Sequence, residues 1–278
     1  MLEIFRLGLT QGKQVLAQEL DLKLGAGQIN VIVGPNGTGK SSLLRALFGE
    51  LRPDRGRIVL DGDELSSMPL ALWRRRFGYM PQDSRLDVSL SVLEVVVLGR
   101  LDHLRLAVDE HSLQQALLAL ENVGLLHLAD RDVATLSGGQ RQMVLFAQVL
   151  LRQPRVLMLD EPVSALDLHY QHVLLERLRE QTRARSWITL MVLHDLNLAA
   201  QYADQLIVLY QGGLAGAGAP EKIMTQQLIE TVYRVKAEVS HDHQGCPFVR
   251  TLRHAWPEET GCSTKVIPLR TQRYDGQG

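Results

Sequence analysis

The fold is decided by one stretch, Ile29-Asn30-Val31-Ile32-Val33 followed at once by Gly34-Pro35-Asn36-Gly37-Thr38-Gly39-Lys40-Ser41. The first five residues are mostly β-branched and apolar, which predicts a strand, and the glycines after them predict a tight loop. Residues 40–50 are helix formers, so we expect the chain to enter a helix directly after the loop. Strand, glycine loop and helix in this order begin an α/β unit.

The loop from Gly34 to Ser41 fits the phosphate-binding pattern G-x-x-x-x-G-K-[ST]. Its backbone N–H groups can surround phosphates, and the helix N-terminus adds a favourable dipole. Lys40 then reaches the outer phosphates, and the Ser41 hydroxyl, with Ser42 beside it, can ligate Mg²⁺. A glycine turn that only caps a helix is the plainer interpretation, but strand and helix both stand where a nucleotide site needs them.

Length and composition limit the class of protein. The chain has 278 residues, 45% of them hydrophobic, which suits one lobed domain. Its formal net charge is -1, so it lacks the basic field of a dedicated nucleic-acid binder. Without a run of about 18 apolar residues or a signal-peptide pattern, we expect a chain that neither spans a membrane nor is secreted. Two cysteines make no disulfide framework, so a reducing cytoplasm is the simplest setting.

Further strands and helices are predicted along the chain. Near-continuous apolar runs over 156–159 and 187–193 favour strands buried on both faces of a parallel sheet. Helical spacing predicts an inserted helical region between about 84 and 135. Shorter strands are expected at 57–60, 77–80 and 206–210, a glycine-rich turn region at 211–219, a last helix from Pro220 to about Tyr233, and a polar tail over 254–278.

Two further segments carry polar groups that suit a nucleotide. The strand over 156–159 runs into Asp160-Glu161, at the carboxyl edge where ligands of open α/β sheets bind. Asp160 would hold Mg²⁺, and Glu161 would polarise the water that attacks the γ-phosphate. Leu136-Ser137-Gly138-Gly139-Gln140 opens a helical run and offers backbone donors and a hydroxyl. Taken alone, this segment could be a simple N-cap.

In this order the motifs resemble those of an ATP-binding-cassette nucleotide-binding domain, over about residues 1–235. The loop at 34–41 matches its phosphate loop, 136–140 its signature, and Asp160-Glu161 its Walker B motif. The resemblance implies an α/β P-loop NTPase core with a mixed sheet, an N-terminal antiparallel β subdomain and an inserted helical subdomain at about 84–155. One domain over 1–253 would contain all of them.

The resemblance also implies a role for each site residue. Glu161 would be the catalytic base, with Gln82 as the Q-loop glutamine and His194 as the switch histidine that senses the γ-phosphate. Mg²⁺ would be held by Ser41, Gln82 and Asp160. ATP would be bound by residues 34–42 and, from the opposite subunit, by Ser137, Gly138, Gly139 and Gln140, with Asp167 at the end of the D-loop Ser164-Ala165-Leu166-Asp167. A second copy of the chain is therefore an expected partner.

One departure concerns the adenine base. Many family members place an aromatic residue before the phosphate loop to stack on adenine, whereas the matching position here falls near Leu9 or Thr10. Phe5 is the nearest upstream aromatic residue. We therefore expect aliphatic contacts to the base and weaker base discrimination.

Two segments narrow the resemblance to ATPases of the iron-siderophore, haem and cobalamin uptake family. They are 91–100, followed by His103, and 238–249, which looks like a terminal hairpin over about 236–252. The resemblance implies an importer with a separate integral-membrane permease, a periplasmic or lipoprotein binding protein, and a peripheral place on the cytoplasmic face of the bacterial inner membrane. His241, His243, Cys246 and Cys262 could instead form a metal site.

Other interpretations stay open at this point. A soluble cassette ATPase acting on nucleic acid or the ribosome would normally show two cassettes, a coiled coil, zinc modules or a basic surface, so no nucleic-acid partner is expected. An inactive subunit is disfavoured because Glu161 and His194 are present. The cargo could also be a different metal or small solute. The basic run 73–76 is expected to be a solvated helix face, and the helix over 92–98 to be core or part of a partner groove.

Overall fold

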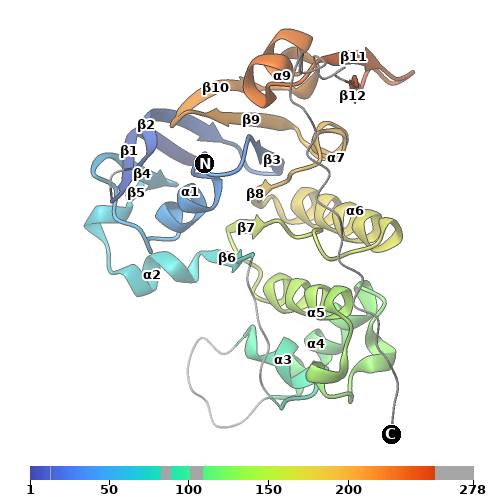
Figure 1. Ribbon diagram of the computed structural model, residues 1–278. Coiled ribbons are helices and arrows are strands. Elements are labelled where there is room, and N and C mark those ends of the chain that lie inside the picture. The colour runs from blue at the N-terminus through green and yellow to red at the C-terminus, as the bar shows by residue number, and fades with distance from the viewer. Residues whose placement is uncertain (13, 83–88, 101–108, 254–278) are drawn as a thin grey trace, which may run out of the picture.

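The computed structural model describes residues 1–12, 14–82, 89–100 and 109–253 (Figure 1). His103, Cys262 and the predicted tail over 254–278 lie outside the described residues. In the part of the chain that is described, no helix is both long and apolar enough to cross a membrane.

A six-stranded sheet forms the centre of the molecule, in the order β10-β9-β3-β8-β7-β6. Five strands are parallel and β10 (Gly213–Gly218) is antiparallel, so the sheet is mixed as predicted. The parallel strands are short and almost fully buried, which explains their near-continuous apolar sequences. They are β3 (Gln28–Val33), β6 (Phe77–Met80), β7 (Val156–Asp160), β8 (Ile188–Val192) and β9 (Gln205–Tyr210).

The two faces of this sheet contact different cores. Ile32 packs on one side, whereas its neighbours Val31 and Val33 pack on the other, as the two-residue period of a strand requires. The first side carries α1 (Lys40–Leu47) and an antiparallel sheet in the order β2-β1-β4-β5, which the sequence predicted. Its strands are β1 (Leu2–Gln11), β2 (Gln14–Leu24), β4 (Arg55–Leu60) and β5 (Asp63–Glu64).

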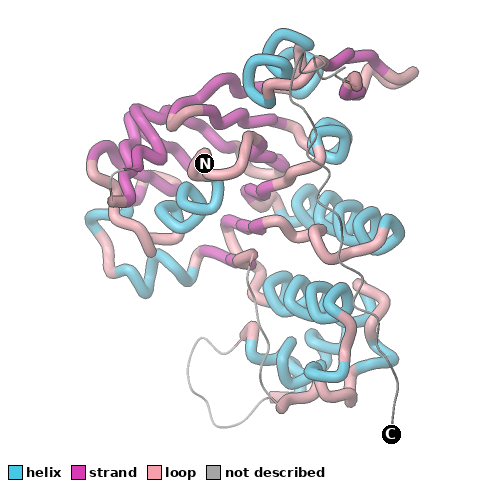
Figure 2. The backbone as a smooth tube through the Cα atoms, viewed as in Figure 1, coloured by secondary structure: helices cyan, strands magenta, loops and turns pink. Residues whose placement is uncertain are grey.

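A group of helices is inserted between β6 and β7, as predicted. It contains α3 (Val92–Leu98), α4 (Glu110–Asn122) and α5 (Gly138–Leu151), and it lies away from the antiparallel sheet (Figures 1 and 2). Local sequence starts each helix. Ser91 and Ser137 form the capping boxes of α3 and α5, and Asp109 caps α4. In α3, Val92, Val95, Val96 and Val97 are buried, so the core interpretation of this helix is correct for most of its side chains.

After β7 the chain continues with two pairs of a helix and a strand, and later forms a β hairpin. Helices α6 (Leu168–Arg185) and α7 (Leu196–Tyr202) alternate with β8 and β9 along the chain. The hairpin of β11 (Ala237–His241) and β12 (Pro247–Thr251) lies beside α9 (Gln226–Tyr233), at the opposite end from α3–α5 (Figure 1). Asn197 of α7 exchanges two hydrogen bonds with the backbone of Val249, which attaches the hairpin to the main body.

Two predictions between β9 and the hairpin were wrong. The expected turn region at 211–219 contains a strand, β10 (Gly213–Gly218), paired with β9. Its glycines hid the strand signal, but they let Ile223 and Leu228 pack directly against the backbone at Gly216. The expected single helix is two helices, α8 (Pro220–Ile223) and α9 (Gln226–Tyr233), because Thr225 caps a new start.

The basic run 73–76 is not the solvated helix face that was expected. In α2 (Leu70–Arg75), Trp73 is fully buried and its indole N–H donates to Leu47 O at 2.8 Å. Arg74 lies over the Phe48 ring and donates to Phe48 O and Gly49 O. These donors satisfy the last carbonyls of α1, which ends at Leu47 rather than near the expected Glu50. The end of the phosphate-loop helix is therefore fixed by side chains of α2.

Candidate active site

The loop between β3 and α1 is shaped by glycines at positions where other residues do not fit. A Cβ on Gly34 would lie 2.2 Å from Leu209 O, and one on Gly39 would lie 2.7 Å from Leu16 O. Both residues also have positive φ angles, of 148° and 90°. The loop can therefore press against β9 and β2 and still deliver the backbone N–H groups at the start of α1 to a bound anion.

Lys40 is the first residue of α1 and its ammonium folds back over the loop. Its Nζ donates to Gly34 O and to Pro35 O, both at 2.9 Å. Burial lowers the pKa of Lys40, while the nearby Glu161 and Asp160 carboxylates act in the opposite direction. Because an ammonium has three donors, two can hold the loop in shape while the third meets a phosphate oxygen.

Asp160 lies at the carboxyl end of β7, two strands away from the loop strand β3. Burial raises its pKa, and a hydrogen bond with Ser41 opposes that shift. Its Oδ1 atom is buried and has no hydrogen-bond partner among the described residues. A buried carboxylate oxygen without a partner beside a serine hydroxyl fits a hard divalent cation such as Mg²⁺, which prefers oxygen ligands.

Glu161 follows Asp160 directly in the chain, and it lines the same cavity as Ser41. Its φ angle is 53°, a left-handed conformation that costs a residue other than glycine about 1–3 kcal/mol. The carboxylate Oε1 contacts Nε2 of His194, which follows β8. The Glu161 side chain is 13% exposed and that of His194 is 45% exposed, so the carboxylate is sheltered while the imidazole faces solvent. The strained turn thus aims a sheltered carboxylate into the site.

Lys40, Glu161 and His194 line one cavity of about 520 Å³ at the carboxyl ends of the parallel strands, whereas the buried Asp160 does not line it. It brings together the glycine loop, the start of α1, and side chains that are far apart in the sequence, including Gln82 and His194. The residues that line it are Gln11, Leu16, Asn36, Gly37, Gly39, Lys40, Ser41, Ser42, Gln82, Glu161 and His194. Gly34, Pro35 and Thr38 shape the loop from behind, where the Thr38 hydroxyl donates to Pro35 O at 2.9 Å.

The predicted signature and D-loop residues lie apart from this cavity. Ser137 and Gly138 are exposed at the start of α5, with Gly139 and Gln140 half-buried. Asp167 is exposed at the start of α6, where its carboxylate accepts from Tyr170 N at 2.9 Å. Within one copy of the chain, both segments therefore act as helix caps, and neither reaches the phosphate loop.

The end of the cavity beyond the loop is formed by residues that the sequence did not single out. Leu9 is buried in the core and the Thr10 hydroxyl donates to Asp54, so neither is the cavity residue that was expected there. Gln11 and Leu16, on the adjoining strands β1 and β2, line the cavity instead. The sequence could not predict which residues line this end, because the register of the β1–β2 pairing shifts between Leu7 and Thr10. The described lining includes the aliphatic Leu16 and no phenylalanine, tyrosine or tryptophan, so aliphatic contacts to the base stay a prediction.

Tyr233 is a second residue that the sequence did not single out. Burial raises the pKa of its hydroxyl to about 12, and a hydrogen bond with the backbone of Gly34 opposes that shift. Helix α9 therefore contacts the first residue of the phosphate loop. Only the fold could reveal this contact, because about 200 residues separate the two positions.

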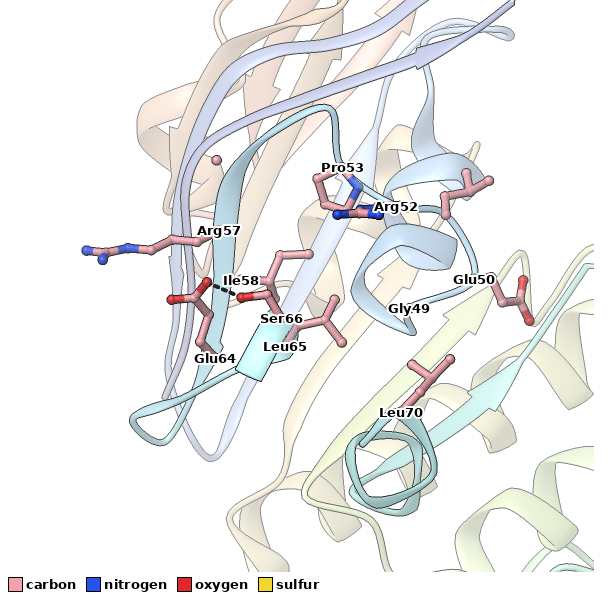
Figure 3. Close-up of a pocket in the computed structure, with 12 residues that line it drawn as sticks. Gly49, Glu50, Arg52, Pro53, Arg57, Ile58, Glu64, Leu65, Ser66 and Leu70 are labelled. Atoms are coloured by element: carbon pink, nitrogen blue, oxygen red, sulfur yellow. Dashed lines mark hydrogen bonds between the residues drawn. The ribbon is translucent and has the colours of Figure 1, made fainter. Parts of the chain in front are cut away.

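Two other features are separate from this cavity. A second cavity, of about 470 Å³, lies where Gly49, Leu65 and Leu70 meet β4, and its lining shares no residue with the first (Figure 3). The metal-site interpretation of the hairpin finds no support in the described part of the chain, which contains no group of three or more histidine, cysteine, aspartate or glutamate residues able to hold a metal ion.

Comparison with known proteins agrees with this geometry. Residues 17–164 match the ABC transporter family. The hemin import ATP-binding protein HmuV of Photobacterium damsela subsp. piscicida is 40% identical over 257 residues, covering 89% of this chain and 95% of that protein. The ferric enterobactin transport ATP-binding protein FepC of Escherichia coli (strain K12) is 38% identical over 258 residues, covering 91% and 94%.

Solved structures give the same result. A chain from an ABC transporter in an inward-facing conformation superposes with a TM-score of 0.78 at 28% identity, covering 91% of this chain and 97% of that chain. An ATP-binding subunit of another ABC transporter gives a TM-score of 0.73 at 27% identity, covering 84% and 98%. The chain belongs to the ABC transporter family, among its ATP-binding subunits, as its motifs predicted.

Proposed function

We propose that this chain is the ATP-binding and ATP-hydrolysing subunit of an importer that takes up an iron-siderophore, haem or cobalamin-type cargo through a separate permease. The observation that carries the proposal is the single cavity in which Lys40, Glu161 and His194 meet. ATP would lie with its phosphates on the loop 34–42 and its base toward Gln11 and Leu16. The names of the relatives, hemin and ferric enterobactin transport proteins, support the cargo class.

Each site residue has a defined task in this proposal. Ser41, Asp160 and Gln82 would hold Mg²⁺, which supplies charge compensation to the phosphate oxygens when it is bound. Lys40 would donate to the terminal phosphate, and Glu161 would accept a proton from the attacking water. His194 would keep the Glu161 carboxylate oriented through the contact between Nε2 and Oε1. One copy of the chain would thus supply all of these catalytic residues. It would lack only the hydrogen-bond donors that contact the far side of the γ-phosphate.

A second copy of the chain would supply those donors. The segment 137–140 is exposed at a helix start, away from its own loop, and offers backbone N–H groups and a hydroxyl. Two copies arranged head to tail would each place this segment over the other's ATP, with Asp167 nearby. Dimer closure would then be coupled to the permease, which would hold the chain at the cytoplasmic face of the inner membrane, beneath a periplasmic or lipoprotein binding protein.

Uptake by whole cells tests the cargo. In a strain that lacks this chain, we expect uptake of iron-55 bound to a siderophore, or of haem, to fall at least tenfold and to recover with the wild-type chain but not with Glu161→Gln. Normal uptake of iron chelates, haem and cobalamin would contradict the cargo class. A defect in uptake of another metal or small solute would then identify the alternative importer, and a defect in ribosome or DNA processing would identify the soluble ATPase.

A further inference from the structure

We propose that Gln142 is a positioning residue that fixes the catalytic turn at Glu161 and connects it to the helix that carries the signature segment. The inference rests on the proposed function, because it assigns Gln142 a part in hydrolysis by Glu161. Gln142 lies in the first turns of α5, half-buried, two residues after Gln140. It does not line the nucleotide cavity, so it would act through Glu161 and not on the substrate.

The side-chain amide of Gln142 contacts both ends of the turn after β7. Its Nε2 donates to Glu161 O at 3.1 Å, and its Oε1 accepts from Ala165 N at 3.3 Å. The backbone of Glu161 is the left-handed one described above, with φ of 53°. The Gln142 amide therefore holds the backbone of Glu161, whose φ angle sets the direction of its carboxylate.

Only an amide satisfies both contacts. The carbonyl of Glu161 can only accept and the N–H of Ala165 can only donate, so this pairing fixes which end of the Gln142 amide is nitrogen. A carboxylate at position 142 could still accept from Ala165 but would face the Glu161 carbonyl with a second acceptor. Gln142→Glu therefore removes one of the two contacts while keeping the size of the side chain.

The same helix contacts the turn through its signature glycine. A Cβ on Gly139 would lie 3.2 Å from Ala165 O and 3.3 Å from a methyl carbon of Leu166, so the helix start packs closely on the turn. When Ser137 binds the nucleotide of the other copy, the start of α5 would move. Gln142 would then transmit this movement to Glu161 of its own chain. Hydrolysis would then be fastest when the signature segment is engaged.

Other contacts keep the turn folded when Gln142 is changed. Gln171 of α6 donates from Nε2 to Val163 O at 3.3 Å and to Leu166 O at 3.0 Å. Ser164 donates from its hydroxyl to Glu161 O at 3.1 Å. A variant of Gln142 should therefore lose the orientation of Glu161 without losing the loop.

The test compares full-length variants by steady-state Mg²⁺-ATPase kinetics. Gln142→Ala and Gln142→Glu should each lower kcat about tenfold or more and leave the KM for ATP within about twofold. Gln148→Ala is the matched control, because Gln148 lies on the same helix, is also half-buried, and donates from Nε2 to Val95 O at 2.8 Å. Its kcat should stay within about twofold of wild type.

Amide hydrogen exchange gives a second readout that does not depend on turnover. The Ala165 amide, which bonds to Gln142, should exchange at least tenfold faster in Gln142→Ala and unchanged in Gln148→Ala. Wild-type kcat in both Gln142 variants, or equal losses in Gln148→Ala, would overturn the inference. If the wild type does not hydrolyse ATP, or Glu161→Gln keeps its rate, the proposed function itself fails and the inference fails with it.

Discussion

The imidazole Nε2 of His194 contacts the carboxylate Oε1 of Glu161, although 33 residues separate them in the chain. The contact follows from the sheet, because β7 and β8 are paired neighbours whose register sets Asp160 opposite Val192. An ionised carboxylate only accepts hydrogen bonds, so Nε2 must carry the proton when Glu161 is ionised. The contact therefore holds the histidine as a hydrogen-bond donor to the Glu161 carboxylate.

Replacing His194 should slow hydrolysis more than it weakens binding. We expect His194→Ala to lower kcat about 100-fold, because the variant loses the donor that orients Glu161, while ATP affinity changes less than about threefold. His169→Ala, at an exposed position of α6, is the matched control and should keep wild-type kinetics. Equal kinetics for the two variants would mean that the contact between His194 and Glu161 has no catalytic value.

The base end of the cavity predicts weak selection among nucleotides. Gln11 and Leu16 offer one polar group and one aliphatic surface, so ATP and GTP should bind within about fivefold of each other in fluorescence titrations. Gln11→Tyr should tighten ATP binding about threefold to tenfold, because a stacked aromatic pair contributes about 0.5–1.5 kcal/mol beyond its buried area. Unchanged ATP affinity in this variant would place the base elsewhere.

The buried indole of Trp73 predicts a large loss of stability. Trp73→Ala removes a fully buried ring and its hydrogen bond to Leu47 O, so the free energy of unfolding should fall by about 3–5 kcal/mol in urea denaturation. Leu72→Ala, next to it on the exposed side of α2, should cost less than about 1 kcal/mol. A small effect of Trp73→Ala would show that α2 does not fix the end of α1.

Asp61 predicts a pH-dependent contribution to stability. Arg155 donates from Nε and Nη2 to the two carboxylate oxygens, at 2.7 and 3.1 Å, and these hydrogen bonds hold the pKa of Asp61 below its usual range. Because the folded pKa is the lower one, the stabilisation is complete above the unfolded value of about 3.9 and is lost as the pH falls below it. Both side chains are partly exposed, so we expect only about 1 kcal/mol.

The measurement is urea denaturation of wild type and Asp61→Asn at several pH values. The difference in the free energy of unfolding should be about 1 kcal/mol at pH 7 and should shrink as the pH falls below about 4. Asp130→Asn, at an exposed position, serves as the control and should show no such trend. A difference that stays constant down to pH 3 would contradict the role of the ion pair.

The sequence indicated several of the residues that the structure gathers around this cavity, because two of its motifs lie at the end of a strand. The loop at 34–41 and Asp160-Glu161 both follow buried apolar strands, whose period and length are strong local signals. The contacts between distant segments could not be predicted in this way. The place of Gln11 in the cavity depends on the irregular β1–β2 register. The burial of Trp73 depends on the distant end of α1, and the contacts of Gln142 depend on the packing of α5 against the turn after β7.

Glycine does not mark a turn where its role is to let neighbouring side chains pack against the backbone. The run that contains β10 has the composition of a loop, yet its backbone pairs with β9 and leaves room for Ile223. Conversely, the charge of Arg74 and Arg76 suggested a solvated face, whereas their guanidinium groups donate to backbone carbonyls such as Phe48 O and Leu60 O. Local composition therefore fails where tertiary partners decide a residue's role.

The most direct test of the central claim is ATP turnover by wild type and Glu161→Gln, with the size of each protein in ATP measured by light scattering. With Mg²⁺ present, the wild type should hydrolyse ATP, and the reaction should stop when EDTA removes the metal. Glu161→Gln should lose at least 100-fold in kcat, still bind ATP, and accumulate as a dimer. Wild-type turnover in Glu161→Gln, with no ATP-dependent dimer, would contradict the assignment of Glu161 as the catalytic base and of residues 137–140 as the partner's ATP contact.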